Sequence, residues 1–315
     1  MDPPAASGVA RLDDLAATAV GYANANRSPA TLRAYASDWR HFEGWCDTHG
    51  VCALPAAPDA LALYLADHAE DWKVSTLNRR LAVISVMHQR HGYPSPTVSP
   101  AVREVAKGIR RQTGAPQRRV SPAVIGDIRR ILAHLPDDLL ATRDRALILI
   151  GFAGALRRSE LVALDVEDIT DRPEGLAVTL RRSKTDQEGA GRIVAIPYGT
   201  ETCPVTALRT WRDKAAITTG PVFRSVDRHG NIAAARLSDR AVALVLKRRA
   251  AAAGLDPDSY SGHSLRAGFA TTAAAHGATE RAIANQTGHR SMEILRRYIR
   301  DGALFTDNGV AALYL

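Results

Sequence analysis

Cysteine, aromatic residues and long apolar runs are all scarce in this chain of 315 residues. Its three cysteines, Cys46, Cys52 and Cys203, form neither a paired framework nor a metal-ligand spacing. The longest apolar run, residues 146–156, is too short to span a bilayer. The N-terminal stretch lacks the basic start and apolar core of a signal peptide. We therefore expect a cytoplasmic protein with no membrane partner and no structural disulfides.

Motifs for metal, nucleotide and hydrolase chemistry are also missing. The sequence contains no H-E-x-x-H, no carboxylate cluster suited to a metal and no G-x-x-x-x-G-K-[ST] loop. The string "GHSLR" starts like a hydrolase nucleophile elbow, but Arg266 stands where the second glycine is required. We expect neither a metal ion nor a cofactor.

Positive charge is in excess. Lys and Arg number 41 against 33 Asp and Glu, which gives a net charge of +8 and an isoelectric point near 9.7. Such a balance favours a polyanionic partner, either nucleic acid or an anionic membrane surface. Because many basic proteins bind neither, charge alone leaves the partner open.

The first third of the chain reads as helical. Apolar residues recur at helical spacing over residues 28–50, 57–72, 75–92 and 101–112. Ser28 and Ser75 are predicted N-caps of the first and third helices. The outward faces of the third and fourth carry the cations Arg79, Arg80, Lys107, Arg110 and Arg111.

A break in periodicity divides the chain. Residues 112–122 contain glycine, two prolines and the pair Arg118–Arg119, and we interpret them as a basic linker. The linker either follows a phosphate backbone or is a solvated loop. Residues 1–111 would then form a helical domain and residues 123–315 a second domain.

The second domain mixes helices with one predicted hairpin. Apolar and polar residues alternate on both sides of a turn within residues 175–197, which indicates two antiparallel strands. Helices are predicted over 121–135, 139–156, 203–216, 237–254, 261–277, 279–288 and 291–300. The fold class is mainly α with a small antiparallel β-sheet.

Several polar residues admit two interpretations when each is taken alone. Arg157 follows an apolar helix and marks either a helix end in water or the lip of a site. Lys184 near the hairpin tip is either solvated or able to reach a cleft. Tyr298 falls at the border of an apolar face made by Met292, Leu295 and Ile299, so it is either an amphipathic border residue or a nucleophile.

The order of these residues resembles the tyrosine recombinase (phage integrase) family, in the two-domain layout of Cre-like and Xer-like enzymes. The matching strings are "ALRRSEL", "RSKT", "GHSLRAGFAT", "TGHRS" and "RRYIR". They supply, in order, Arg157, Glu160, Lys184, His263, Arg266, Gly288, His289 and Tyr298. The resemblance implies a helical core-binding (SAM-like) domain and a mixed α/β catalytic domain that form a C-shaped clamp around DNA.

The resemblance also implies a reaction and a role for each residue. Tyr298 attacks a DNA phosphodiester and forms a 3′-phosphotyrosyl link, without metal or ATP. Arg157 and Arg266 hold the phosphate, and Lys184 protonates the leaving 5′-oxygen. The three remaining residues assist: His263 moves a proton or bonds the phosphate, His289 bonds a phosphate oxygen, and Glu160 orients its neighbours. The string "GAL" before Arg157, where many members have "TGL", is expected to affect packing and not the site.

The implied partners are a double-stranded recombination site and further copies of the chain. Candidate backbone contacts are Arg79, Arg80, Lys107, Arg110, Arg111 and Arg118. A dimer on each DNA site and a tetramer on two sites are expected in the nucleoid, with the tail 302–315 docked on a neighbouring protomer. Alternatively the tail packs on its own domain or is disordered. Two other functions stay open, a type IB topoisomerase and a non-catalytic DNA-binding protein.

Overall fold

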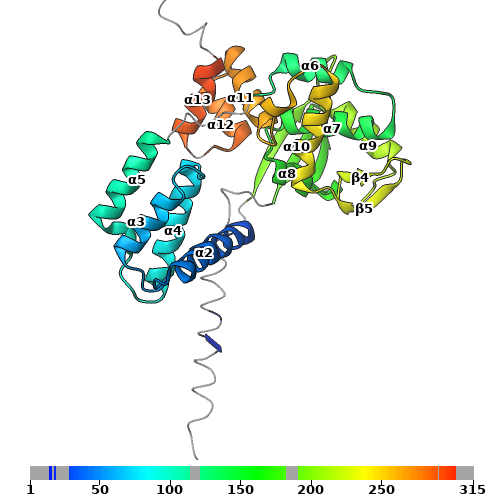
Figure 1. Ribbon diagram of the computed structural model, residues 1–315. Helices are drawn as coiled ribbons and strands as arrows, with labels where there is room; N and C mark the ends of the chain where they lie inside the picture. The colour runs from blue at the N-terminus through cyan, green and yellow to red at the C-terminus, as the bar shows by residue number, and fades with distance from the viewer. Residues whose placement is uncertain are drawn as a thin grey trace, which may run out of the picture. The chain divides into compact units, whose positions relative to one another are not determined.

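The computed structural model describes residues 14, 15, 18, 28–113, 121–181, 191–289 and 291–302, with only the backbone for residues 29, 30, 294 and 300–302. The chain divides into two compact units (Figure 1). Described residues 28–113 belong to the N-terminal unit and residues 121–302 to the C-terminal unit. The predicted linker falls between them, and because most of it lies outside the described residues its limits remain a prediction.

The N-terminal unit is helical, as predicted. Its elements are α2 (Pro29–His49), α3 (Pro58–Asp67), α4 (Val74–Arg90), the 3-10 turn η1 (Pro96–Val98) and α5 (Pro100–Gln112). Ser28 caps α2 by accepting a hydrogen bond from the Thr31 amide. The predicted cap at Ser75 is wrong, because α4 begins two residues earlier and its N-cap is Lys73.

Apolar faces of these helices meet in one core. Phe42 of α2, Leu61 and Tyr64 of α3, and Leu77 and Ile84 of α4 are all buried. Leu61 and Tyr64 are three positions apart and Leu77 and Ile84 are seven, which places each pair on one face of its helix. The opposite face of α5 carries exposed cations that are candidates for DNA contact. The predicted outward direction of Arg80 on α4 is wrong, because its side chain is 12% exposed.

The C-terminal unit combines helices with two small sheets (Figure 1). Its helices are α6 (Ile125–Ala133), α7 (Leu139–Ala153), α8 (Arg158–Ala163), α9 (Pro204–Lys214), α10 (Asp239–Ala252), α11 (Ser264–Ala275), α12 (Glu280–Thr287) and α13 (Met292–Gly302), with 3-10 turns η2 (Val166–Asp168) and η3 (Pro257–Ser259). Its strands are β1 (Ile169–Arg172), β2 (Gly175–Leu180), β3 (Arg192–Pro197), β4 (Arg224–Val226) and β5 (Ile232–Arg236).

The predicted hairpin within residues 175–197 is confirmed as β2 and β3, which pair antiparallel and are extended by β1. Val178 lies opposite Val194 and both face the core, whereas Ile193 on the other face is 70% exposed. The pair β4–β5 was not predicted. Both strands are short, and the alanines of β5 favour helix when read by propensity alone.

Helix α7 runs through the middle of the core and ends earlier than predicted. Leu147, Ile148 and Ile150 are fully buried. The helix stops at Ala153, and Ala155 takes a left-handed conformation with φ of 48°. The chain therefore reverses before α8, which begins at Arg158.

Helix α11 joins the main core to a second, smaller one. Leu265 packs in the main core, while Ala270 packs with Ile283 of α12 and Leu295 of α13. Met292, Tyr298 and Ile299 pack against this smaller cluster, so the predicted apolar face of α13 is confirmed. The smaller core therefore fixes α12 and α13 on the helix that carries Arg266. Among the described residues, no helix combines the length and apolar character needed to cross a membrane.

Candidate active site

The first turn of α8 places Arg157 and Glu160 in direct contact. Arg157 is the N-cap residue, and its backbone N–H donates to Glu160 Oε2 at 2.9 Å. Its guanidinium Nη1 donates to the other carboxylate oxygen of the same side chain. The Glu160 side chain is 2% exposed and that of Arg157 is 13% exposed. A buried carboxylate three residues along the helix thus fixes the direction of the arginine.

Arg266, in the first turn of α11, is 5% exposed. Its Nη1 donates to the Ala155 carbonyl oxygen at 2.8 Å. The "GAL" string thus supplies a backbone acceptor to a predicted site residue at Ala155. The expectation that its difference from "TGL" affects packing and not the site stays a prediction.

The other end of this guanidinium is unsatisfied. Arg266 Nη2 is buried and has no hydrogen-bond partner among the described residues. Burial, together with the charge of Arg157, lowers the pKa of Arg266 to about 10. The group remains a cation at neutral pH. A bound anion would therefore satisfy the buried N–H donor and balance its charge.

His289 follows the left-handed cap Gly288 at the end of α12. Its Nδ1 lies 2.8 Å from Thr287 Oγ1, and that hydroxyl donates to the Ile283 carbonyl oxygen at 2.7 Å. Nδ1 of His289 is therefore the donor, which leaves the lone pair on Nε2. Burial, together with the charges of Arg266, Arg157 and Arg192, lowers the pKa of His289 to about 4, so the ring is neutral at pH 7.

Tyr298 lies half-buried on α13, with its ring centroid 6.0 Å from that of His289. It is also close enough to Arg266 for a phenolate charge to favour the cation. The two arginines that precede it on the helix form other ion pairs, Arg296 with Glu280 and Arg297 with Glu293. The structure thus brings Tyr298 to Arg266, an arginine distant in sequence.

Two other predicted site residues, His263 and Lys184, are not among the contacts described above. His263 is the N-cap of α11, one turn before Arg266, and is exposed. Lys184 lies outside the described residues. The five residues that the structure gathers are Arg157, Glu160, Arg266, His289 and Tyr298.

Sequence reasoning missed one member of this group, Arg192 at the start of β3. Its charge acts on Arg266 and His289, and the charges of Arg157 and Glu160 act on it. Burial lowers the pKa of its guanidinium. The sequence did show a cation at the base of the predicted hairpin. The direction of the Arg192 side chain, however, depends on which helix packs beside the strand.

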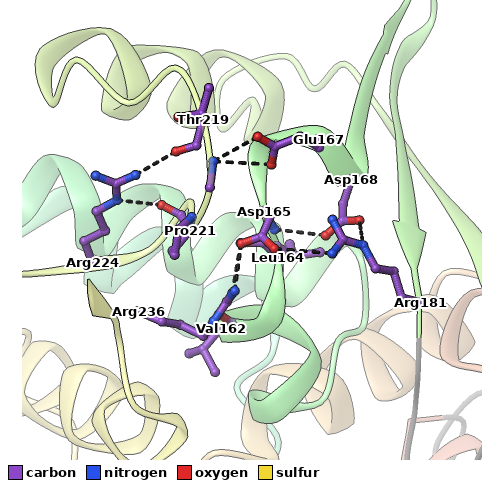
Figure 2. Close-up of polar contacts among 11 residues, drawn as sticks. Val162, Leu164, Asp165, Glu167, Asp168, Arg181, Thr219, Pro221, Arg224 and Arg236 are labelled. Carbon is purple, nitrogen blue, oxygen red and sulfur yellow. Dashed lines mark hydrogen bonds and ion pairs between the residues drawn. The ribbon is translucent and has the colours of Figure 1, made fainter. Parts of the chain in front are cut away.

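A polar network holds the turn that follows α8 (Figure 2). Arg181, directly after β2, pairs with Asp168 at 2.5 Å and with Asp165 at 3.5 Å. Arg236, at the end of β5, pairs with the other oxygen of Asp165 at 2.7 Å. These ion pairs join the ends of β2 and β5 to the region after α8, and so support the helix that carries Arg157.

Cations of the N-terminal unit differ in whether their side chains are exposed to bind DNA or are paired within the unit. Arg79 pairs through two nitrogens with buried Asp38. Arg80 has a side chain 12% exposed that lies over the Trp72 ring and donates to the Tyr64 hydroxyl, so it serves packing within the unit. Three predicted DNA contacts on α5 are exposed, namely Lys107, Arg110 and Arg111. Arg118 lies outside the described residues.

Acidic and thiol side chains do not assemble a metal centre in the part of the chain that the structure describes. No group of three or more His, Cys, Asp or Glu residues there is arranged to hold an ion. The cluster around Tyr298 contains one carboxylate, Glu160, and it is occupied by Arg157. The donors of this site are cations suited to an anion.

Family comparison agrees with this combination of fold and site. Residues 126–303 match the phage integrase family, and residues 22–90 match the N-terminal SAM-like domain of phage integrases. The chain belongs to the phage integrase family, the tyrosine recombinases.

Individual relatives extend over most of the chain. An integrase/recombinase xerD homolog of Selenomonas ruminantium is 43% identical over 296 residues, covering 92% of this chain and 86% of that protein. The recombinase cre of Escherichia phage P1 is 27% identical over 295 residues, covering 87% of this chain and 84% of that protein.

Solved structures share the fold at low sequence identity. A lambda integrase dimer bound to a COC′ core site gives a TM-score of 0.62 at 16% identity, covering 87% of this chain and 73% of that one. The Tn1549 transposon integrase in complex with transposon right end DNA also gives 0.62 at 16% identity, covering 92% and 95%.

Proposed function

We propose that this chain is a site-specific DNA recombinase that cleaves and rejoins DNA strands through a 3′-phosphotyrosyl intermediate. One observation carries the proposal: the buried, unsatisfied Nη2 of Arg266 lies in a cluster with Arg157 and Tyr298. A phosphodiester supplies the anion that this donor lacks and the phosphorus that a tyrosine oxygen can attack. Membership of the phage integrase family supports the same reaction.

The reaction proceeds in two balanced transfers. The Tyr298 oxygen forms a bond to phosphorus, its proton leaves, and the bond from phosphorus to the 5′-oxygen breaks. Lys184 supplies a proton to that leaving oxygen. The 5′-hydroxyl of a partner strand then reverses these steps, so the phosphodiester is restored without consumption of a nucleotide.

The arginines meet the charge that develops during the transfer. Arg157 and Arg266 are held by Glu160 and by the Ala155 carbonyl before substrate arrives, so little reorganisation is needed. His263, exposed at the start of the helix that carries Arg266, is the candidate to move a proton at the tyrosine.

His289 requires a proton before it can donate to the phosphate. Its Nδ1 already donates to Thr287, so the neutral ring offers only an acceptor at Nε2. A bound phosphate anion opposes the surrounding cations and raises the pKa of the imidazole. We therefore place proton uptake by His289 at the DNA-binding step.

The proposed partner is double-stranded DNA, with the exposed cations of α5 on the phosphate backbone and the reaction in the nucleoid. Lambda integrase, which shares the fold, is known as a tetramer bound to a Holliday junction. We propose the same assembly here, a dimer on each site and a tetramer on two. The tail proposed to join protomers, residues 302–315, lies outside the described side chains.

Covalent trapping tests this function. Nicked duplexes tiled across the DNA that flanks the gene are incubated with the protein, because loss of the short nicked product leaves the adduct stranded. The wild type should form a covalent adduct that is resistant to denaturant, and Tyr298→Phe should form none while still binding DNA. An adduct that persists in Tyr298→Phe would refute the nucleophile, and relaxation of supercoils without a second site would indicate a topoisomerase.

A further inference from the structure

A side-chain clasp joins strand β3 to the end of helix α12. Nη1 of Arg192 donates to the carbonyl oxygens of Asn285 at 3.2 Å and Gln286 at 3.0 Å, and Nη2 donates to that of Thr287 at 3.4 Å. These carbonyls belong to the last turn of α12, where the helix supplies no amide partner and its dipole is negative. One guanidinium therefore donates to the last three carbonyl oxygens of α12.

A side chain of α12 also donates hydrogen bonds back to the strand. Gln286 donates its Nε2 to the Ala195 carbonyl oxygen of β3 at 3.0 Å and to the Ala153 carbonyl oxygen, at the end of α7, at 2.7 Å. The end of α12 is thus bonded in both directions to the strand, and once to the helix that precedes Arg157. These contacts join segments about ninety or more positions apart in the sequence.

The residue after α12 confirms how closely the guanidinium approaches. Gly288 has φ of 63°, and a Cβ at this position would lie 2.9 Å from Nε and Cζ of Arg192. Glycine permits both the left-handed cap and the close passage of the side chain. His289 follows immediately, so the last carbonyl of the clasp, that of Thr287, lies two positions before a predicted site group.

We propose that Arg192 is a positioning residue which, together with Gln286, fixes the end of α12 to β3 and thereby holds His289 and the following helix with Tyr298 against Arg266. Its catalytic consequence rests on the proposed recombinase function, whereas the clasp itself is a property of the fold. The two outer nitrogens of the planar arginine fork span three consecutive carbonyls, whereas the lysine ammonium holds its three donors on one nitrogen. The positioning role therefore depends on shape as well as on charge.

Two substitutions separate shape from charge. Arg192→Lys keeps the charge and loses the fork, Arg192→Gln loses both, and Arg172→Gln on exposed β1 of the same sheet is the matched control. In single-turnover cleavage of the nicked duplex at saturating protein, both Arg192 variants should be about 10- to 100-fold slower, since small misplacements of reacting groups cost about that much. DNA affinity should stay near that of the wild type. A wild-type cleavage rate in Arg192→Lys would overturn the positioning role in favour of charge alone.

A second measurement is independent of activity. Hydrogen exchange of the DNA-free protein should show faster exchange at the Gly288 and His289 amides in both Arg192 variants and in Gln286→Leu, with no change in Arg172→Gln. If the Arg192 variants do not fold, Gln286→Leu alone carries the test, because it removes the helix-side half of the clasp. Unchanged exchange in the folded variants would overturn the clasp. Absence of a covalent adduct in the wild type would instead refute the recombinase function. The hydrogen-exchange measurement would then still test whether Arg192 and Gln286 hold the end of α12.

Discussion

Replacing Glu160 by glutamine should destabilise the C-terminal unit through the arginines around it. Glu160 pairs directly with Arg157, and its charge favours the cationic forms of Arg192 and Arg266. Glutamine keeps an oxygen for the Arg157 backbone amide but loses the charge. Three guanidinium groups would then lie together without the carboxylate that acts on all of them.

The expected cost follows from burial. Removing one partner of a buried ion pair costs about 3–5 kcal/mol, because the other charge stays buried. The Arg157 side chain retains 13% exposure, so water offsets part of the loss and the lower end, about 3 kcal/mol, is expected. In a unit of this size that free energy corresponds to a fall in Tm of about 6–12 °C.

Calorimetry of Glu160→Gln against the wild type measures this fall, with Glu174→Gln as the control. Glu174 is an exposed residue in the turn between β1 and β2, and its substitution should leave Tm nearly unchanged. Bound DNA should narrow the deficit of Glu160→Gln, because a phosphate supplies negative charge to the same guanidinium groups. An unchanged Tm in Glu160→Gln, or an equal fall in the control, would refute the view that Glu160 balances this cluster.

Three further predictions concern titration and charge. The folded-state pKa of His289 is about 4 against an ordinary 6.5, so as the pH falls the unfolded chain takes up the proton first. The stability that neutral His289 contributes is therefore complete above pH 6.5 and is lost as the pH falls toward 4. His289→Gln should flatten that part of a curve of unfolding free energy against pH. Isothermal titration at pH 5.5 in buffers of different ionisation enthalpy should show proton uptake on DNA binding in the wild type and less in His289→Gln; equal uptake in both would exclude His289 as the acceptor. Substituting Lys107, Arg110 or Arg111 by glutamine should reduce the slope of log affinity against log salt by about 1 for each phosphate that the side chain neutralises, and an unchanged slope would remove that residue from the DNA-binding face.

Local features of the site were readable from the sequence. The spacing of Met292, Leu295 and Ile299 placed Tyr298 at the border of an apolar face, and alternation over residues 175–197 predicted β2 and β3. These features depend on side-chain periodicity along one element, which is set within a few residues of the chain. The roles of the gathered residues came from the resemblance to tyrosine recombinases and stay predictions until trapping is done.

Other features were decided by tertiary packing. Arg266 finds its acceptor at Ala155, 111 positions earlier, and Arg192 reaches carbonyls of Asn285 and Gln286, 93 and 94 positions later. No periodicity encodes such contacts, because they exist only when α11 packs beside α7 and α12 beside β3. The sequence by itself determined which residue types are present and which faces of each helix are apolar. The tertiary structure decided which arginines lie around Tyr298, because direction and burial arise from the contact of elements that are distant in the chain.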